Sequence, residues 1–351
     1  MNHYCTYFDR GYLVQGLALW HSLRRWDAQS VLFVVSLDLE TAQALRALDD
    51  KRLRILELSE LLGRDPKLRT RQTRSRIEFI FALTPCVVLH LLATQPEIDR
   101  ILYLDADLFF FGPPLPIWTE FSDGSVYIVP HRYPAGSNDD RLYGRYNVGV
   151  VGFHRDETGL ACLEWWRERC LESTALLADG ERYGDQKYLD EWPGRFRAVI
   201  VSQHLGINVA PWNWRGHHFT GGGQFGELRV NGAPLVVFHF AQFRRISERW
   251  FDSGQLEYGI MPRQLRTTIY GPYWDALVAA EGQVRAVLPS FAIPRHGWLA
   301  SLESWRMALL RLTFGQFWYR AGTTWVSGHV GLGRFAGAIM VYYRRWQRRS
   351  R

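Results

Sequence analysis

The stretch Arg100-Ile-Leu-Tyr-Leu-Asp-Ala-Asp107 decides the fold of this chain. Its apolar run, residues 101–104, is typical of a strand buried on both faces of a parallel sheet. Asp105 and Asp107 follow directly, and carboxylates two positions apart on a strand project to the same side. Two carboxylates at the end of a buried strand are costly unless they share a hard divalent cation. The alternative is that both aspartates are simply solvated at a strand end.

Further strand patterns alternate with helical ones along the chain. Residues 31–37 form a β-branched apolar run, and residues 39–48 place apolar side chains on one face of a helix. Other apolar runs lie at residues 125–129, 147–153, 198–201 and 235–240. Strands alternating with helices predict an α/β fold with a mainly parallel sheet flanked by helices. In such sheets ligands bind outside the carboxyl ends of the strands, where the two aspartates are expected.

Several motifs in order resemble those of GT-A-fold glycosyltransferases, family 8 in particular. They are Thr6 to Leu13 ahead of a helix, the Y-L-D-x-D pattern ending at Asp107, Tyr146-Asn-Val-Gly-Val150, Gly184-Asp-Gln186 and Val237-Phe-His-Phe240. The resemblance covers about residues 3 to 250. It implies the Rossmann-like GT-A fold and transfer of a sugar, of the hexosyl type, from a nucleotide-sugar donor.

The resemblance also implies a metal site. Its ligands would be Asp105, Asp107 and His239, and a mixed oxygen and nitrogen set favours Mn²⁺, with Mg²⁺ as competitor. The alternative for His239 is an ordinary buried imidazole on an apolar strand.

Donor-binding residues follow from the same resemblance. The candidates are Thr6, Tyr7, Asp9, Tyr12, Arg74, Asn147, Arg244 and Arg245. Asp9 would lie near the base, or would instead cap the helix over residues 13–23. Asn147 would touch the donor sugar, or would bond its own backbone. Arg244 or Arg245 replaces a lysine with which the family often holds the diphosphate, and Arg74 is one candidate for an early family arginine or else lies on a solvated helix face.

Asp185 and Gln186 match the family's pair beside the reacting carbon, so they are the expected catalytic residues. The family retains anomeric configuration, and Gln186 would steady positive charge on the sugar. If Asp185 acted as a general base on the far face, inversion would follow.

Two segments are expected to border the site. Residues 130–146 have loop composition and could order over the donor. Asn208, residues 211–214 and the pair His217-His218 could form an acceptor wall. The tandem histidines also raise the alternative of a second metal site.

Charge divides the 351-residue chain into two parts. The segment from Phe291 to Arg351 carries ten arginines and a single acid, Glu303, for a net charge of +9, whereas residues 1–290 carry −2. We therefore expect a catalytic domain over residues 1–290 and a basic, amphipathic helical tail over residues 291–351. Apolar residues recur at helical spacing within 298–312 and 335–346.

Aromatic residues on one face and arginine on the other suit an anionic membrane surface. The tail could instead dock on the catalytic domain, and nucleic-acid binding is not expected. No secretory leader and no run near 18 apolar residues is apparent, so a cytoplasmic location on the inner face of the membrane is predicted. The four cysteines lack metal-site spacing and are expected to be reduced and free.

The sequence thus predicts a metal-dependent glycosyltransferase of polysaccharide biosynthesis, acting on a lipid-linked or glycan acceptor. A nucleotidyltransferase is the alternative enzyme, but residues 6–12 lack a glycine-rich phosphate loop. A catalytically silent, membrane-docked interaction protein is the alternative from another class. Donor sugar, nucleotide, linkage and oligomeric state stay open at this stage.

Overall fold

The computed structural model describes residues 1–73, 75–177, 182–222, 225–245, 250–254, 258, 262–292, 317–321 and 324–327. Within them a large sheet has the strand order β3-β2-β1-β4-β7-β6-β8. These strands are β1 (His3–Phe8), β2 (Val31–Ser36), β3 (Leu53–Glu57), β4 (Arg100–Leu104), β6 (Val126–Pro130), β7 (Tyr146–His154) and β8 (Val199–Val201). Neighbours pair in parallel except at β7, which is antiparallel to β4 and to β6. The predicted α/β fold with a mainly parallel sheet is confirmed.

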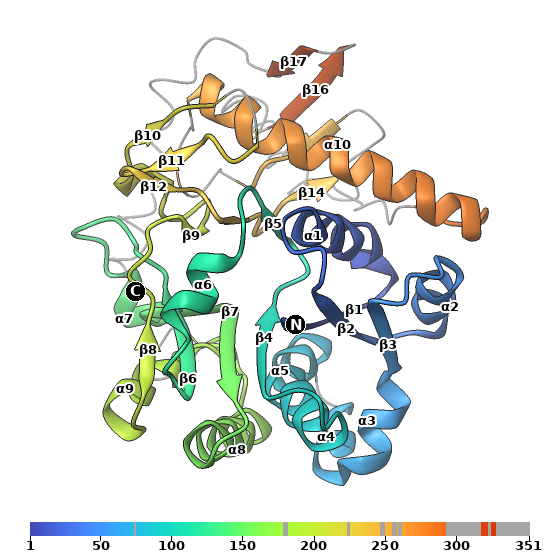
Figure 1. Ribbon diagram of the computed structural model, residues 1–351, viewed down its shortest axis with the longest axis vertical. Helices are drawn as coiled ribbons and strands as arrows, with labels where there is room; N and C mark the ends of the chain where they lie inside the picture. Colours follow the sequence, from blue (N-terminus) through green and yellow to red (C-terminus); the bar gives the residue numbers. More distant parts are fainter. Residues whose placement is uncertain are drawn as a thin grey trace.

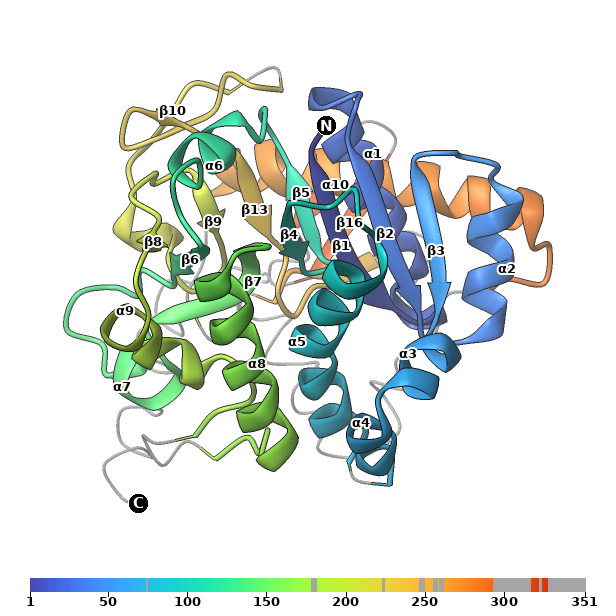
Figure 2. The same cartoon turned by 60° about the horizontal axis from the view of Figure 1, so that its bottom comes forward.

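Helices cover both faces of this sheet (Figure 1). They are α1 (Leu13–Trp26), α2 (Leu39–Ala47), α3 (Leu58–Arg64), α4 (Pro66–Arg71), α5 (Arg76–Thr94), α6 (Leu115–Glu120), α7 (Asp139–Tyr143), α8 (Glu157–Glu172), α9 (Trp192–Arg195) and α10 (Arg263–Val287), with the 3-10 turns η1 (Arg10–Tyr12), η2 (Lys187–Glu191) and η3 (Trp214–Gly216). Figures 1 and 2 show α1 beside α10 on one face and α5 beside α8 on the other. Strand β4 serves both layers, because Leu102 and Leu104 face the α1 and α10 side while Ile101 and Tyr103 face α5 and α8.

Smaller sheets extend one end of the large one. The sheet β5-β13-β9 contains β5 (Leu108–Phe110), β13 (Val237–His239) and β9 (Ile207–Val209). Another contains β10 (Phe219–Thr220), β11 (Arg229–Val230) and β12 (Ala233–Pro234). A third contains β14 (Arg244–Arg245), β15 (Trp250–Asp252), β16 (Phe317–Ala321) and β17 (Thr324–Ser327).

The third small sheet contains strands from both sides of the expected domain boundary at residue 290. Strand β16 pairs antiparallel with β15, so residues 317–321 and 324–327 extend a sheet that begins in the expected catalytic domain. The amino-acid pattern of these residues did not predict strands. The helices expected over residues 298–312 and 335–346 lie outside the described residues, as does most of the basic tail. The helical tail and its membrane contact therefore stay predictions.

Helix α5 corrects one sequence expectation. Among the described residues it is long and apolar enough to cross a membrane by length and composition, although no such run was expected. More than half of its apolar window is buried inside the protein, and it packs on β1, β4 and α8. A buried core helix has the same length and composition, and the burial of α5 makes it part of the core. The four cysteines are free and buried, as expected.

Candidate functional site

The chain passes from the large sheet to a small one at the two aspartates. Asp105 follows β4 directly, and Asp107 comes just before β5. Strand β13 runs antiparallel to β5 with His239 opposite Leu108, and the Phe240 N–H donates to the Asp107 carbonyl at 2.9 Å. This pairing brings His239 beside two carboxylates that are far from it in sequence.

The three side chains converge closely. His239 Nε2 lies 3.1 Å from Asp107 Oδ1 and 3.6 Å from Asp105 Oδ2. One ligand atom of each residue lies within 4.8 Å of the others. His239 is only 5% exposed, whereas both carboxylates are partly open to solvent. The imidazole is therefore the buried part of the cluster, and the two carboxylates are its solvent-accessible part.

Electrostatics oppose this arrangement when no cation balances it. Burial raises the pKa of Asp105, and the Asp107 carboxylate adds to the rise while His239 counters it. Burial alone would lower the pKa of His239, but Asp107 and then Asp105 outweigh it, so the pKa is raised. A like-charged pair that is this crowded gains from a shared cation.

The donor set fits a divalent metal. Two carboxylates and an imidazole are ligands accepted by Mn²⁺ and, with less preference for nitrogen, by Mg²⁺. A cation held by Asp105, Asp107 and His239 would supply Lewis-acid stabilisation to a phosphate leaving group.

A third acidic group, Asp185, lies deeper. Its carboxylate accepts from the Thr84 hydroxyl at 3.1 Å, and its carbonyl accepts from Trp166 Nε1 at 2.9 Å. Burial, with a further contribution from Asp105, raises the pKa of Asp185 to about 7. Asp185 therefore holds its proton more strongly than a carboxyl group in water does.

Polar side chains connect Asp185 towards the metal cluster. The Thr84 and Tyr7 hydroxyls lie 2.9 Å apart, and the Tyr7 hydroxyl donates to the Ile80 carbonyl at 2.8 Å. The ring of Tyr7 lies 5.6 Å from that of Tyr103, whose hydroxyl donates to Asp105 at 2.8 Å. Tyr7, predicted to bind the donor, is thus committed to this internal network.

Gln186 holds a neighbouring segment. Its Nε2 donates to the Tyr143 carbonyl at 2.8 Å, and Lys187 Nζ donates to the carbonyls of Asp140 and Arg141. The predicted loop 130–146 therefore contains a short helix, α7, tied to the Asp185-Gln186 turn. The segment that borders the site and the expected catalytic pair are mechanically linked.

Asn147 and Gly149 lie behind the histidine. Asn147 Oδ1 accepts from the Gly149 N–H at 3.0 Å, and Asn147 Nδ2 lies 3.2 Å from His131 Nε2. The bond to the Gly149 N–H is the local backbone bond expected as the alternative to a donor-sugar contact of Asn147. A Cβ on Gly149 would approach Asn147 Oδ1 to 2.6 Å and His239 Nδ1 to 2.8 Å. Only glycine leaves room for both side chains there.

The first strand and turn contribute an edge of the site. Thr6 is fully buried, so its side chain presents no surface to a ligand, and its donor-binding role stays a prediction. Asp9 Oδ1 accepts from the Gly11 N–H at 2.8 Å and caps η1, not α1, while its other oxygen pairs with Arg76. The Tyr12 side chain is 48% exposed. Partial burial, with further contributions from the carboxylates of Asp107 and Asp105, raises its pKa to about 12.

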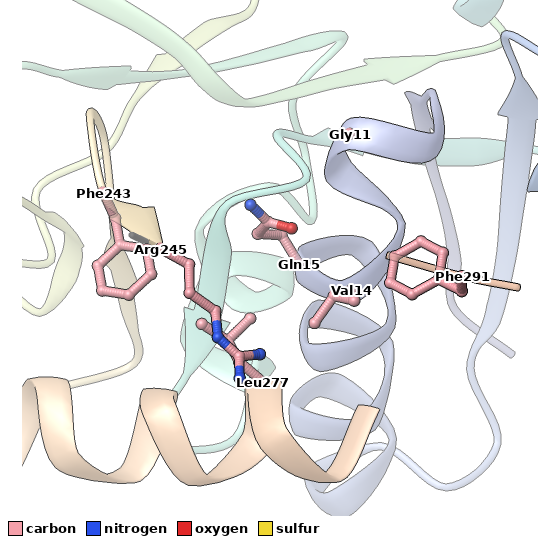
Figure 3. A pocket seen from close by; sticks show the side chains of 7 residues that line it. All are labelled: Gly11, Val14, Gln15, Phe243, Arg245, Leu277 and Phe291. Carbon is pink, nitrogen blue, oxygen red and sulfur yellow. The ribbon is translucent and has the colours of Figure 1, made fainter. Parts of the chain in front are cut away.

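The expected basic residues divide. Arg244 is exposed, whereas Arg245 is buried, pairs with Glu281 and lies over the Trp274 ring at 4.9 Å. Figure 3 shows Arg245 between α1 and α10 at a cavity of about 20 Å³, room for one water molecule. Of the two, Arg244 is the one whose side chain is open to solvent. Arg74 lies outside the described residues.

The expected acceptor wall is partly internal. Asn208 and Asn213 are fully buried, and Trp212 Nε1 and Asn213 Nδ2 both donate to the His131 carbonyl. The Trp212 ring packs edge-on against His239 at 5.2 Å. Among the described residues, potential metal ligands group at Asp105, Asp107 and His239 and not at the tandem histidines.

The sequence did not predict the contact of Thr84 with Asp185, the position of Asn208 beside His239 or the steric role of Gly149. A hydroxyl within the otherwise apolar middle of α5 is the one signal that could have marked Thr84. The place of Asn208 depends on a strand pairing that sequence does not reveal.

Comparison with known proteins gives relatives without a described activity. No family model matches the chain. It is 34% identical over 252 residues to the uncharacterized protein YfnF of Bacillus subtilis (strain 168), covering 70% of this chain and 82% of YfnF. It is 28% identical over 302 residues to the uncharacterized protein YfnD of the same organism, covering 84% of this chain and 95% of YfnD.

Solved structures with similar architecture include glycosyltransferases. An active-site mutant of LgtC is 14% identical over 80% of this chain and 95% of its own, with a TM-score of 0.47. Mouse xyloside xylosyltransferase 1 is 18% identical over 69% of this chain and 98% of its own, with a TM-score of 0.44. Since both scores are below 0.5, the assignment of a function depends on the site itself.

Proposed function

The chain belongs to the same family as the Bacillus subtilis protein YfnF, and we propose that it is a metal-dependent glycosyltransferase that uses a nucleotide-sugar donor. The observation that carries the proposal is the convergence of Asp105, Asp107 and His239 within 4.8 Å at the carboxyl end of β4. A cation bound by these side chains would suit a diphosphate, because the charge of the diphosphate must be balanced before its bond to a sugar breaks. The motifs resembling GT-A enzymes supply the same interpretation.

The reaction transfers a glycosyl group. A bond forms between an acceptor hydroxyl oxygen and the anomeric carbon, while the bond from that carbon to the diphosphate breaks. The nucleoside diphosphate leaves with the bonding electron pair, and the acceptor proton passes to it in the retaining course that we favour. Gln186 would lie beside the reacting carbon, and Asp185 would hold the donor sugar. The exposed Arg244 would add positive charge near the phosphates.

Finer features belong to the proposal as well. Mn²⁺ is the favoured cation because the set includes an imidazole, and Mg²⁺ is the competitor. The acceptor is a lipid-linked or growing glycan in polysaccharide biosynthesis, and the enzyme works at the inner face of the membrane. The basic composition of residues 291–351 motivates this location.

A donor screen tests the function. Thermal unfolding of the full chain should be followed with each common nucleotide sugar, with and without Mn²⁺, because a bound donor raises the stability of the folded state by mass action. The matching donor should raise the unfolding temperature only with Mn²⁺, and slow release of free sugar should accompany it. Asp105→Asn should abolish both effects.

The same assays separate the alternatives. A nucleotidyltransferase would release pyrophosphate from a nucleoside triphosphate and a sugar phosphate, without hydrolysing a nucleotide sugar. A silent interaction protein would show no turnover with any donor. Either result would refute the glycosyltransferase proposal.

A further inference from the structure

The imidazole of His239 has a second nitrogen that faces away from the carboxylates. Its Nδ1 lies 3.3 Å from Asn208 Oδ1, and both residues are buried. An imidazole that gives its Nε2 lone pair to a cation carries a proton on Nδ1. That proton needs an acceptor, and the partner fixes both the tautomer and the direction of the ring.

A bulge aims Asn208 at the histidine. In the pairing of β9 with β13, Ile207 lies opposite Val237 and Val209 lies opposite Phe238, so Asn208 is the additional residue between two consecutive partners. Bulges of this kind re-aim a side chain and occur next to functional sites. Side chains alternate between the two faces of a regular strand, so without the bulge the side chain at position 208 would point in another direction.

The backbone and the side-chain contact of residue 208 both bear on why it is asparagine. Asn208 has a left-handed backbone with φ of +62°, which asparagine, aspartate and glycine tolerate best. Its Nδ2 is buried and has no partner among the described residues. An unpaired buried amide nitrogen destabilises the fold, and the contact of Oδ1 with His239 offsets part of that cost.

Neighbouring groups hold this pair in place. Asn213 Nδ2 donates to the Asn208 carbonyl at 3.0 Å, and Asn213 Oδ1 accepts from the Ala210 N–H at 2.9 Å. The Trp212 ring lies against the ring of His239. Both members of the pair therefore have little freedom to turn away from each other.

We propose that Asn208 is a positioning residue for the metal site: its Oδ1 accepts the Nδ1 proton of His239 and thereby keeps Nε2 as the cation-binding atom. The inference depends on the proposed function only in that His239 is a metal ligand. The amide acts through His239 and touches neither cation nor donor.

Two substitutions at one position provide the test. Asn208→Gly keeps a residue that accepts the left-handed backbone and removes the acceptor, whereas Asn208→Asp keeps an acceptor and also tolerates that backbone. The probe is Mn²⁺ alone, titrated into the metal-free full chain and followed by electron paramagnetic resonance. Asn208→Gly should weaken Mn²⁺ binding about 10- to 100-fold, the range typical of outer-shell partners, and Asn208→Asp should bind at least as tightly as the parent protein.

A second background tests whether the effect passes through the histidine. In His239→Ala, adding Asn208→Gly should change Mn²⁺ affinity less than twofold. Parent-like binding by Asn208→Gly, or an equal loss in the His239→Ala background, would overturn the inference while leaving the proposed function intact. If Asn208→Gly does not fold, weakened binding by Asn208→Asp would overturn it. No Mn²⁺ binding by the parent protein would refute the metal site of the proposed function and the inference with it.

Discussion

The hydroxyl of Thr84 on α5 donates to the carboxylate of Asp185 at 3.1 Å, across 101 positions of sequence. The bond lies within the core, where little water can help to solvate a charge. One hydroxyl donor favours the ionised form, but burial and the nearby Asp105 outweigh it and raise the pKa of Asp185 to about 7. The environment of this carboxyl group therefore favours its protonated form.

Replacing Asp185 should change how stability depends on pH. Its pKa is about 7 in the folded protein against an ordinary 3.8, so between pH 4 and 7 the folded state binds more protons than the unfolded state. The free energy of unfolding should then fall as pH rises through this window, by up to about 1.4 kcal/mol per unit, and level off above it. Asp185→Asn should flatten the slope.

Urea unfolding from pH 4 to 8 measures this dependence. Part of the slope should persist in Asp185→Asn, because the pKa of Asp105 is raised by burial as well. Asp123→Asn, on an exposed carboxylate, is the matched control and should leave the slope as it is. An unchanged slope in Asp185→Asn would mean that Asp185 is ionised throughout.

Removing one metal carboxylate should separate binding from folding. Asp105→Asn or Asp107→Asn relieves the repulsion between two crowded carboxylates, so the metal-free protein should be as stable as the parent or slightly more so. Mn²⁺ at 100 times its dissociation constant should stabilise the parent by about 2.7 kcal/mol, and neither variant should respond to it. Thermal unfolding with and without Mn²⁺ measures both effects. A variant that keeps the Mn²⁺ response would contradict the ligand assignment.

Gly149 should be intolerant of a single methyl group. A Cβ there would lie 2.6 Å from Asn147 Oδ1 and 2.8 Å from His239 Nδ1, so either side chain must move. We expect Gly149→Ala to cost about 1–3 kcal/mol of stability and to weaken Mn²⁺ binding by displacing His239. Calorimetry of unfolding and Mn²⁺ titration check the two parts. Gly63→Ala on α3 is the control, because its Cβ would meet no atom within 4 Å and alanine favours the helix.

Gln186 and Lys187 allow catalysis to be distinguished from tethering of α7. Gln186→Ala should lower kcat with KM for the donor nearly unchanged, the pattern of an interaction made mainly in the transition state. Lys187→Ala removes the other tether to the carbonyls of Asp140 and Arg141 and should chiefly raise KM. Steady-state kinetics with the matching donor compare the two. If Gln186→Ala and Lys187→Ala change kcat and KM in the same way, Gln186 only holds α7 in place.

The sequence could predict the large sheet because its strands are apolar runs of recognisable length. Residues 31–37 and 101–104 were expected as strands and are β2 and β4 with small changes at their ends. The short β9 and β13 depend on tertiary pairing, so the convergence of His239 on Asp107 followed from a resemblance and not from periodicity. Asn208 shows most clearly what the sequence could not predict. It was expected to contact the sugar acceptor, but a one-residue bulge makes it a buried partner of His239.

The membrane prediction requires a later truncation than the charge boundary suggests. Phe291 is buried beneath the Arg10 guanidinium, and β16 pairs with β15, so deletion from residue 291 would damage the fold itself. Deletion after Ser327 keeps β16 and β17 and removes six arginines, at positions 334, 344, 345, 348, 349 and 351. Each arginine near an anionic surface contributes about 1 kcal/mol, so the truncated chain should no longer float with phosphatidylserine vesicles.

The matched control keeps the length and changes only the charge. Replacing Arg344, Arg345, Arg348 and Arg349 by glutamine should remove most of the electrostatic attraction to the vesicles. Vesicle binding by the parent chain should weaken in the same way as salt rises, because exposed charges are screened beyond about 8 Å at physiological ionic strength. Turnover on a soluble acceptor should persist in both variants, since the metal cluster lies before residue 240. If the glutamine variant floats like the parent, the arginines are not what holds the chain to the vesicle.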